Sequence, residues 1–174
     1  MGDWDHYREK GRVVEIEFGE LMGKFGKVTP STPEQDMREH IDMFLTSNKT
    51  KQTTSFDVKA VKEIKRGTGK DDTAHHIELL NVNGHDGWLY GKATFISFET
   101  FKTFVVVDRL KLINLIDRYL DKPIYCFDEP LPYCIYKRKD YINKHGEVKR
   151  RKDETMLVET SKLIEIATLI INKN

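Results

Sequence analysis

The chain has 174 residues and a mass of 20.4 kDa, a length that is typical of one domain. Its 29 Lys and Arg side chains balance 28 Asp and Glu side chains, and 39% of the residues are hydrophobic. This composition excludes an acidic disordered tail and a uniformly basic nucleic-acid-coating protein, and it supplies enough apolar side chains for a sizeable core.

The sequence has no signals for membrane insertion or secretion. Its apolar runs are far shorter than the roughly 20 residues that span a bilayer. Residues 1–5 contain neither the basic nor the apolar region of a signal peptide. Cys126 and Cys134 lack the spacing of a zinc site and are too few for a disulfide framework. We therefore expect a reduced, cytoplasmic protein without membrane contact.

The first third of the chain predicts a helix followed by a hairpin. Apolar side chains recur at steps of three and four within residues 7–25, which predicts an amphipathic helix capped by Gly26. Residues 29–33 are rich in Pro, Ser and Thr and predict a loop. The runs 40–46 and 53–61 are strand-like and flank a polar turn, so they predict an antiparallel hairpin.

The rest of the chain mixes strands and helices. Further strands are predicted over residues 75–82, 92–98, 103–107, 134–137 and 155–158. Helices are predicted over residues 109–120, with Asp108 as N-cap, and from Thr160 or Ser161 to residue 171. This order predicts an α/β domain with a central mixed sheet flanked by helices. Residues 1–122 form the predicted core, and residues 123–174 add a basic hairpin and a C-terminal helix to the same domain.

Charged side chains share one face of the predicted hairpin. Asp57 and Lys59 point to the same side of their strand because side chains alternate along it. Asp42, in the preceding strand, can meet Asp57 at one end of the sheet. Glu15 lies on one border of the apolar stripe of the first helix and Glu17 on the other, so either acid could join them.

These residue types suit metal-assisted phosphodiester hydrolysis. Carboxylates are the hard oxygen ligands that Mg²⁺ prefers, and a divalent cation would relieve the repulsion between them. The cation acidifies a bound water and stabilises negative charge on the transition state. A lysine beside the ligands can orient the attacking water or stabilise the phosphorane oxygens.

The spacing of these residues resembles that of a known superfamily. Asp42, fourteen intervening residues and then Asp57-Val58-Lys59 resemble the PD-(D/E)XK nuclease motif. Ile41 stands where that motif has Pro, and Asp57 stands where Glu is more usual. Residues 11–22 resemble the opening helix of archaeal Holliday-junction resolvases. His76 to Gly91, with its Gly-Trp-Leu-Tyr-Gly run, is similar to small phage-encoded nucleases.

The resemblance implies a restriction-endonuclease-like fold and a deoxyribonuclease that depends on Mg²⁺, or on Mn²⁺. It implies that Glu15, Asp42, Asp57 and the carbonyl of Val58 hold the metal, with Lys59 as the motif lysine. A homodimer is also implied by resemblance. Action on branched DNA, exonuclease or flap cleavage and restriction-like cutting share the same core and stay open.

A late basic segment predicts contacts with DNA. Residues 136–152 carry eight Lys and Arg side chains against Asp140 and Glu147, with tyrosines interleaved. A solvated hairpin is the alternative. The predicted DNA-contacting residues are Lys62, Lys137, Arg138, Lys149, Arg150, Arg151, Lys152 and Trp88.

Several residues and functions allow more than one interpretation. Trp88 could stack on a base or belong to the core, and Glu78 could add an acid to the site or lie at a strand end. Adjacent His75 and His76 point to opposite faces of a strand and do not predict a metal site. A catalytically inactive nucleic-acid-binding module and a phage accessory protein that contacts other proteins are the alternative functions.

Overall fold

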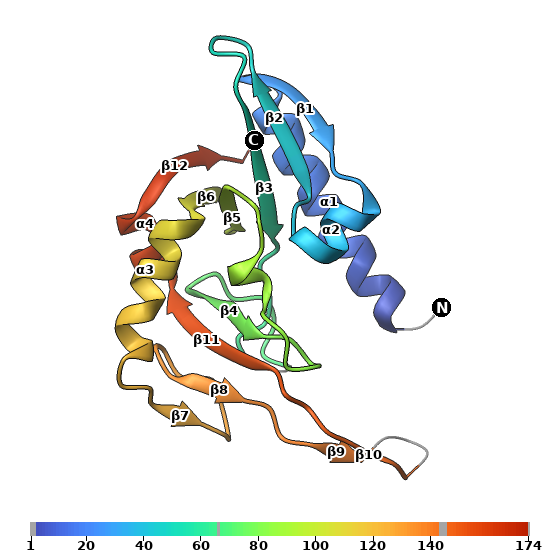
Figure 1. Cartoon of the computed structure of the whole chain (residues 1–174), viewed down its shortest axis with the longest axis vertical. Helices are drawn as coiled ribbons and strands as arrows, with labels where there is room; N and C mark the ends of the chain where they lie inside the picture. Colours follow the sequence, from blue (N-terminus) through green and yellow to red (C-terminus); the bar gives the residue numbers. More distant parts are fainter. Residues whose placement is uncertain (1–2, 66, 143–145, 174) are drawn as a thin grey trace.

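The computed structural model describes residues 3–65, 67–142 and 146–173 (Figure 1). Its helices are α1 (Asp3–Met22), α2 (Pro33–Glu39), the 3-10 turn η1 (Trp88–Tyr90), α3 (Arg109–Leu120) and α4 (Thr160–Glu165). Its longer strands are β1 (Gly26–Pro30), β2 (Met43–Ser47), β3 (Thr53–Lys59), β4 (Ala74–Leu80), β5 (Phe95–Glu99), β6 (Thr103–Asp108), β11 (Glu154–Glu159) and β12 (Ala167–Asn172). Its shorter strands are β7 (Tyr125–Cys126), β8 (Ile135–Lys137), β9 (Tyr141–Ile142) and β10 (Val148–Lys149).

A six-stranded mixed sheet forms the centre of the fold. Its strand order is β1-β2-β3-β5-β6-β12, and every neighbouring pair is antiparallel except the parallel pair β3 and β5. A second sheet has the order β4-β11-β8-β7. The predicted α/β class with a mixed sheet and flanking helices is therefore confirmed.

Helix α1 covers one face of the six-stranded sheet. Phe18 is fully buried, and its ring lies 5.5 Å from that of Phe56 on β3 and 5.1 Å from that of Phe104 on β6. The other buried members of this core are Val14, Leu21, Met22, Met43, Leu45, Val58 and Val106. The apolar stripe predicted from the sequence is thus the surface that docks the helix on the sheet.

The opposite face of the six-stranded sheet packs against α3 and the four-stranded sheet. Ile96, Phe98, Val105 and Val107 contribute the sheet side of this second core. The remaining buried members come from β4, β8, β11, α3, α4 and η1 (Ile77, Leu79, Leu89, Leu112, Leu115, Ile116, Ile135, Met156, Val158 and Leu163). The fold therefore has three layers, with α1 outside one face and α3 with the smaller sheet outside the other (Figure 1).

Several predicted elements are confirmed. The hairpin of β2 and β3 has Met43 opposite Phe56. Asp108 caps α3, because its carboxylate accepts hydrogen bonds from the backbone N–H groups of Leu110 and Lys111.

Two elements differ from the prediction. Gly26 does not cap α1 but begins β1, where a Cβ would collide with the carbonyl oxygen of Thr46. The predicted loop over residues 29–33 is partly strand, because β1 extends to Pro30 and pairs with β2. Proline is tolerated there because β1 is an edge strand.

The predicted C-terminal helix to residue 171 is also wrong. Helix α4 ends at Glu165, and Ala167–Asn172 form the edge strand β12, which pairs with β6. The run Thr-Leu-Ile-Ile favours a strand because β-branched side chains fit a pleated sheet, and the open edge of β6 supplies the partner. Helical periodicity within so short a segment carries no information about that long-range pairing.

Residues 123–174 contribute strands to both sheets. Strand β11 pairs with β4, and β12 pairs with β6. Strands β9 and β10 pair with each other alone and form an arm that extends away from the two sheets (Figure 1). None of the helices in the described ranges is both long enough and apolar enough to cross a bilayer.

Candidate functional site

Asp42 and Val58 meet where β2 begins and β3 continues beyond it. The backbone N–H of Val58 donates a 2.6 Å hydrogen bond to Oδ2 of Asp42, and the N–H of Asp42 donates to the carbonyl of Phe56. A strand residue directs its N–H and C=O to the same side. The carbonyl of Val58 is therefore directed to the side on which the Asp42 carboxylate lies.

Asp57 lies beside Asp42 on the face of the sheet away from α1. It is 2% exposed, and its Oδ1 forms a 2.5 Å ion pair with Nζ of Lys59. Its Oδ2 is buried and has no hydrogen-bond partner among the described residues. The predicted alternation is thus correct, since Phe56 and Val58 are in the α1 core while Asp57 and Lys59 contact each other on the opposite face.

The two aspartates occupy an environment that disfavours negative charge. Burial and the neighbouring Asp57 raise the pKa of Asp42 to about 7. Burial also raises the pKa of Asp57, although Lys59 opposes the shift. Two desolvated carboxylates in contact cannot both ionise cheaply without a compensating cation.

The structure distinguishes between Glu15 and Glu17, the two candidate acids of α1. Burial, followed by the nearby carboxylates of Asp42 and Asp36, raises the pKa of Glu15 to about 7. Glu17 lies on the other side of the helix and forms an ion pair of 3.1 Å with Lys173. Glu15 is therefore the helix acid that shares the electrostatic environment of Asp42.

The ring of Trp88 lies against the ammonium group of Lys59. The ammonium of Lys59 lies 4.7 Å from the centre of the Trp88 ring, and Trp88 in turn packs against Phe98 of the core. Trp88 is half-buried and part of a 3-10 turn. A cation above an aromatic face is attracted to it, which restricts where the lysine can point.

The Gly-Trp-Leu-Tyr-Gly run, residues 87–91, also packs against the turn between α2 and Asp42. The backbone N–H of Lys92, which directly follows this run, donates to the backbone carbonyl of Glu39 at 2.7 Å. The Nζ of Lys92 also forms an ion pair of 2.8 Å with the Glu39 side chain. A Cβ at Gly91 would crowd His40, which itself adopts a left-handed conformation (φ 53°) at the end of α2. This packing fixes the turn from α2 into β2.

Glu78 and Lys62, the remaining candidates, lie near the site and differ in how exposed they are. The Oε2 of Glu78 accepts a 3.3 Å hydrogen bond from the N–H of Trp88, so this acid supports the 3-10 turn. Lys62 is exposed along its stem, but desolvation of its ammonium group and the nearby Lys59 lower its pKa. Lys59, Lys62 and Trp88 line one side of a pocket of about 30 Å³.

The adjacent histidines point apart, as the sequence indicated. His75 is buried against the ring of Phe98, whereas Nε2 of His76 donates to the carbonyl of Ile64 at 3.2 Å. Burial lowers the pKa of His75 to about 4 and lowers that of His76, so both rings are neutral at physiological pH. Among the described residues, no three His, Cys, Asp or Glu side chains are close enough to hold one ion together.

The basic segment is more neutral than its sequence suggests. Lys137 pairs with Glu154 at 2.8 Å, and Lys139 with Asp128 at 2.7 Å. The buried Asp153 accepts contacts from two arginines, Arg138 and Arg151. Lys149 pairs with Glu147. The count over residues 136–152 left out Asp128, which precedes this segment, and Asp153 and Glu154, which directly follow it.

Arg150 and Lys152 are the basic arm residues that lack an ion-pair partner within the described residues. Arg138 lies near enough to lower the pKa values of Lys62 and His76, after the larger effect of burial. The base of the arm is therefore electrostatically connected with the aspartate site. Arg150 and Lys152 are exposed where the chain runs from β10 back to β11.

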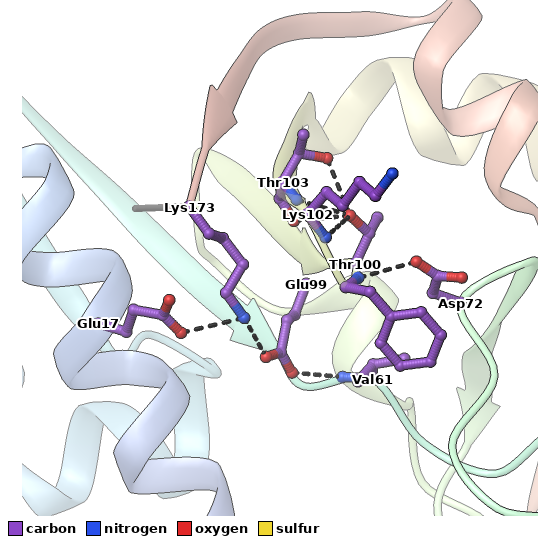
Figure 2. Close-up of polar contacts among 9 residues, drawn as sticks. Glu17, Val61, Asp72, Glu99, Thr100, Lys102, Thr103 and Lys173 are labelled. Atoms are coloured by element: carbon purple, nitrogen blue, oxygen red, sulfur yellow. Dashed lines mark hydrogen bonds and ion pairs between the residues drawn. The ribbon is translucent and has the colours of Figure 1, made fainter.

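Glu99 is a residue near this site that the sequence analysis missed. It ends β5, is 5% exposed, and contacts both Val61 and Lys173 (Figure 2). The available signal was an acid at the end of the apolar run Phe-Ile-Ser-Phe-Glu, because a buried charge needs a partner. Its partners are distant in sequence, so the run itself could not identify them.

Comparisons with protein-family models, with curated proteins and with solved structures give no match for this chain.

Proposed function

We propose that this protein is a divalent-metal-dependent deoxyribonuclease that hydrolyses phosphodiester bonds. The observation that carries the proposal is the pair of the half-buried Asp42 and the buried Asp57 beside Lys59, with one carboxylate oxygen of Asp57 unpartnered among the described residues. Such a pair combines hard oxygen ligands with a lysine at the position where an attacking water needs orientation.

The donor set fits Mg²⁺ or Mn²⁺. Asp42, Asp57 and the carbonyl of Val58 would hold the ion, and Glu15 would complete or support their shell. When bound, the ion supplies an acidified water and neutralises charge on the phosphoryl group and the 3′-oxygen leaving group. Lys59 would orient the water, and Trp88 would restrict Lys59. The resemblance of Asp42 and Asp57-Val58-Lys59 to the nuclease motif supports the same assignment.

DNA is the proposed substrate, with the exposed Arg150 and Lys152 of the arm as backbone contacts. The ion-paired bases Lys137, Arg138, Lys149 and Arg151, together with Lys62 and Trp88, remain in the proposed contact surface. Their existing carboxylate partners would have to be exchanged for phosphates, which lowers the net gain from each contact. A homodimer that acts on branched DNA belongs to the same proposal.

The test is cleavage of plasmid, single-stranded and four-way-junction DNA with Mg²⁺, Mn²⁺ or EDTA. We expect cleavage that EDTA abolishes and that falls by at least about 100-fold in Asp57→Asn and Lys59→Met. Glu20→Gln, on the exposed side of α1, is the matched control and should cut normally. Binding to DNA without cleavage by the unmodified protein under all conditions would reject the enzyme.

A second candidate, a non-catalytic DNA-binding module, is favoured by one specific contact. Lys59 pairs directly with Asp57, so the chain itself already neutralises one of the two carboxylates. In that case Asp57→Asn and Lys59→Met would leave DNA binding unchanged. Neutralising Arg150 and Lys152 would abolish it.

A further inference from the structure

Glu99 contacts the main chain immediately beyond the proposed site. Its Oε2 accepts a 2.8 Å hydrogen bond from the N–H of Val61, two residues after Lys59. Strands β3 and β5 are parallel, with Lys59 opposite Phe98. Glu99 therefore continues the pairing of these strands by a side-chain bond where β3 ends, and it fixes the direction in which the chain leaves Lys59.

Lys173 holds Glu99 in this position. Its Nζ lies 2.7 Å from Oε1 of Glu99, so both oxygens of this buried carboxylate have partners (Figure 2). Although burial favours the neutral amine, hydrogen bonds to Glu99 and Glu17 raise the pKa of Lys173, which keeps it charged. Removing the ammonium would leave Glu99 as a buried, uncompensated charge.

The same ammonium also contacts the helix that carries Glu15. Nζ of Lys173 lies 3.1 Å from Oε2 of Glu17, and in Figure 2 the lysine side chain extends from the end of β12 toward Glu17 on α1. Glu17 is two residues from Glu15. One lysine thus connects the helix that supplies the third acid with the strand end that follows Asp57 and Lys59.

The position of Lys173 is itself determined by the sheet. Its N–H donates to the carbonyl of Lys102 at 2.9 Å, and its ammonium lies 5.2 Å from the centre of the Phe104 ring. Both partners belong to the β5–β6 region, to which β12 adds as the edge strand. The side chain therefore has little freedom to leave Glu99.

We propose that Lys173 and Glu99 are positioning residues that set the divalent-cation affinity of the site formed by Asp42, Asp57 and the Val58 carbonyl, which Glu15 supports from α1. This inference rests on the proposed function, because it concerns the same carboxylates. Neither residue touches the ion or the substrate. They act by fixing α1 and the end of β3 relative to each other, so that the three acids are held in place before an ion arrives.

The test is a Mn²⁺ titration followed by electron paramagnetic resonance of free Mn²⁺, well below the unfolding temperature. Outer residues that orient metal ligands typically contribute 10- to 100-fold in affinity, and we expect Lys173→Met to bind Mn²⁺ about 10-fold more weakly. Lys173→Arg should restore most of the affinity. The matched control is Lys162→Met, since that lysine pairs with Glu165 on α4, away from the site.

A second measurement separates positioning from simple stability. Hydrogen exchange of the Val61 amide reports whether the bond to Glu99 is intact. The double variant Glu99→Gln with Lys173→Met leaves no unpaired charge in the buried interior, since Glu17 is partly exposed, and should fold, yet it loses the link to Glu17. We expect weaker Mn²⁺ binding in this variant also, with no comparable loss in Lys162→Met.

The outcomes distinguish this inference from the proposed function. Absence of Mn²⁺ binding in the unmodified protein would reject the metal site, and the positioning role with it. Tight binding in the unmodified protein together with equal affinity in Lys173→Met and in the double variant would reject the positioning role alone. Faster exchange at Val61 without any change of affinity would show that the contact serves stability only.

Discussion

The backbone N–H of Val58 donates a 2.6 Å hydrogen bond to the carboxylate of Asp42, which lies just before β2 and extends its pairing with β3. This bond fixes the carboxylate beside the buried Asp57, on the sheet face opposite α1. The same contact helps to define the geometry of the candidate site and by itself favours the ionised form of Asp42, but burial outweighs it and raises the pKa values of both aspartates.

A divalent cation should stabilise the folded protein. Saturating Mg²⁺ or Mn²⁺ at pH 8 should raise Tm by about 5 °C or more, because ligand that binds only the native state adds free energy of unfolding. Differential scanning fluorimetry with and without EDTA measures this shift. Asp57→Asn should abolish it, whereas Asp121→Asn at the exposed end of α3 should keep it. An equal shift in both variants would place the cation elsewhere.

Stability without divalent ions should fall as pH rises from about 4 to about 7. The pKa values of Asp42 and Glu15 are raised to about 7 in the folded state, so the unfolded chain loses these protons first and the native state binds more of them. The free energy of unfolding then decreases with pH across this window. Urea denaturation in EDTA at several pH values measures the slope.

Asp42→Asn provides the control for that pH dependence. Asparagine keeps an oxygen that can accept the Val58 N–H but carries no charge. The variant should be more stable than the unmodified protein at pH 8, with Tm higher by about 2–6 °C, and nearly equal to it at pH 4. A variant that is less stable at both pH values would show that the carboxylate charge is not the cause.

The docking of α1 should depend on Phe18. This ring is fully buried and contacts the rings of Phe56 and Phe104, so Phe18→Ala should lower the free energy of unfolding by about 3–5 kcal/mol. Val13→Ala, on the exposed face of the same helix, should cost less than about 0.5 kcal/mol. Chemical denaturation measures both, and similar losses would contradict the assigned helix face.

DNA affinity should depend unequally on the basic arm. Neutralising both Arg150 and Lys152 with glutamine should reduce the slope of log affinity against log salt concentration by about 2, because each free cation displaces counterions from a phosphate. Neutralising Lys137 and Lys139, which pair with Glu154 and Asp128, should change the slope less. Fluorescence anisotropy with a labelled duplex measures these slopes, and the opposite ranking would exclude Arg150 and Lys152 as the contact surface.

Local sequence patterns predicted the elements whose stability is local. Helix α3 was predicted with its bounds and its Asp108 cap, because periodicity and capping act within a few residues. The hairpin of β2 and β3 was predicted for the same reason. The strand β12 was not, since a six-residue β-branched run becomes a strand here by pairing with β6, about 60 residues earlier.

By itself the sequence determined which side chains alternate on β3, so that Asp57 and Lys59 share a face with Asp42 near one end. Only the tertiary structure decided that Glu15 approaches these acids while Glu17 turns to Lys173, and that Glu99 holds Val61. It also decided that carboxylates just outside the basic segment neutralise much of the arm. The physical reason is the distance along the chain over which each interaction acts. Alternation follows from backbone geometry within one strand, whereas burial and ion pairing depend on residues that meet only after the sheets assemble.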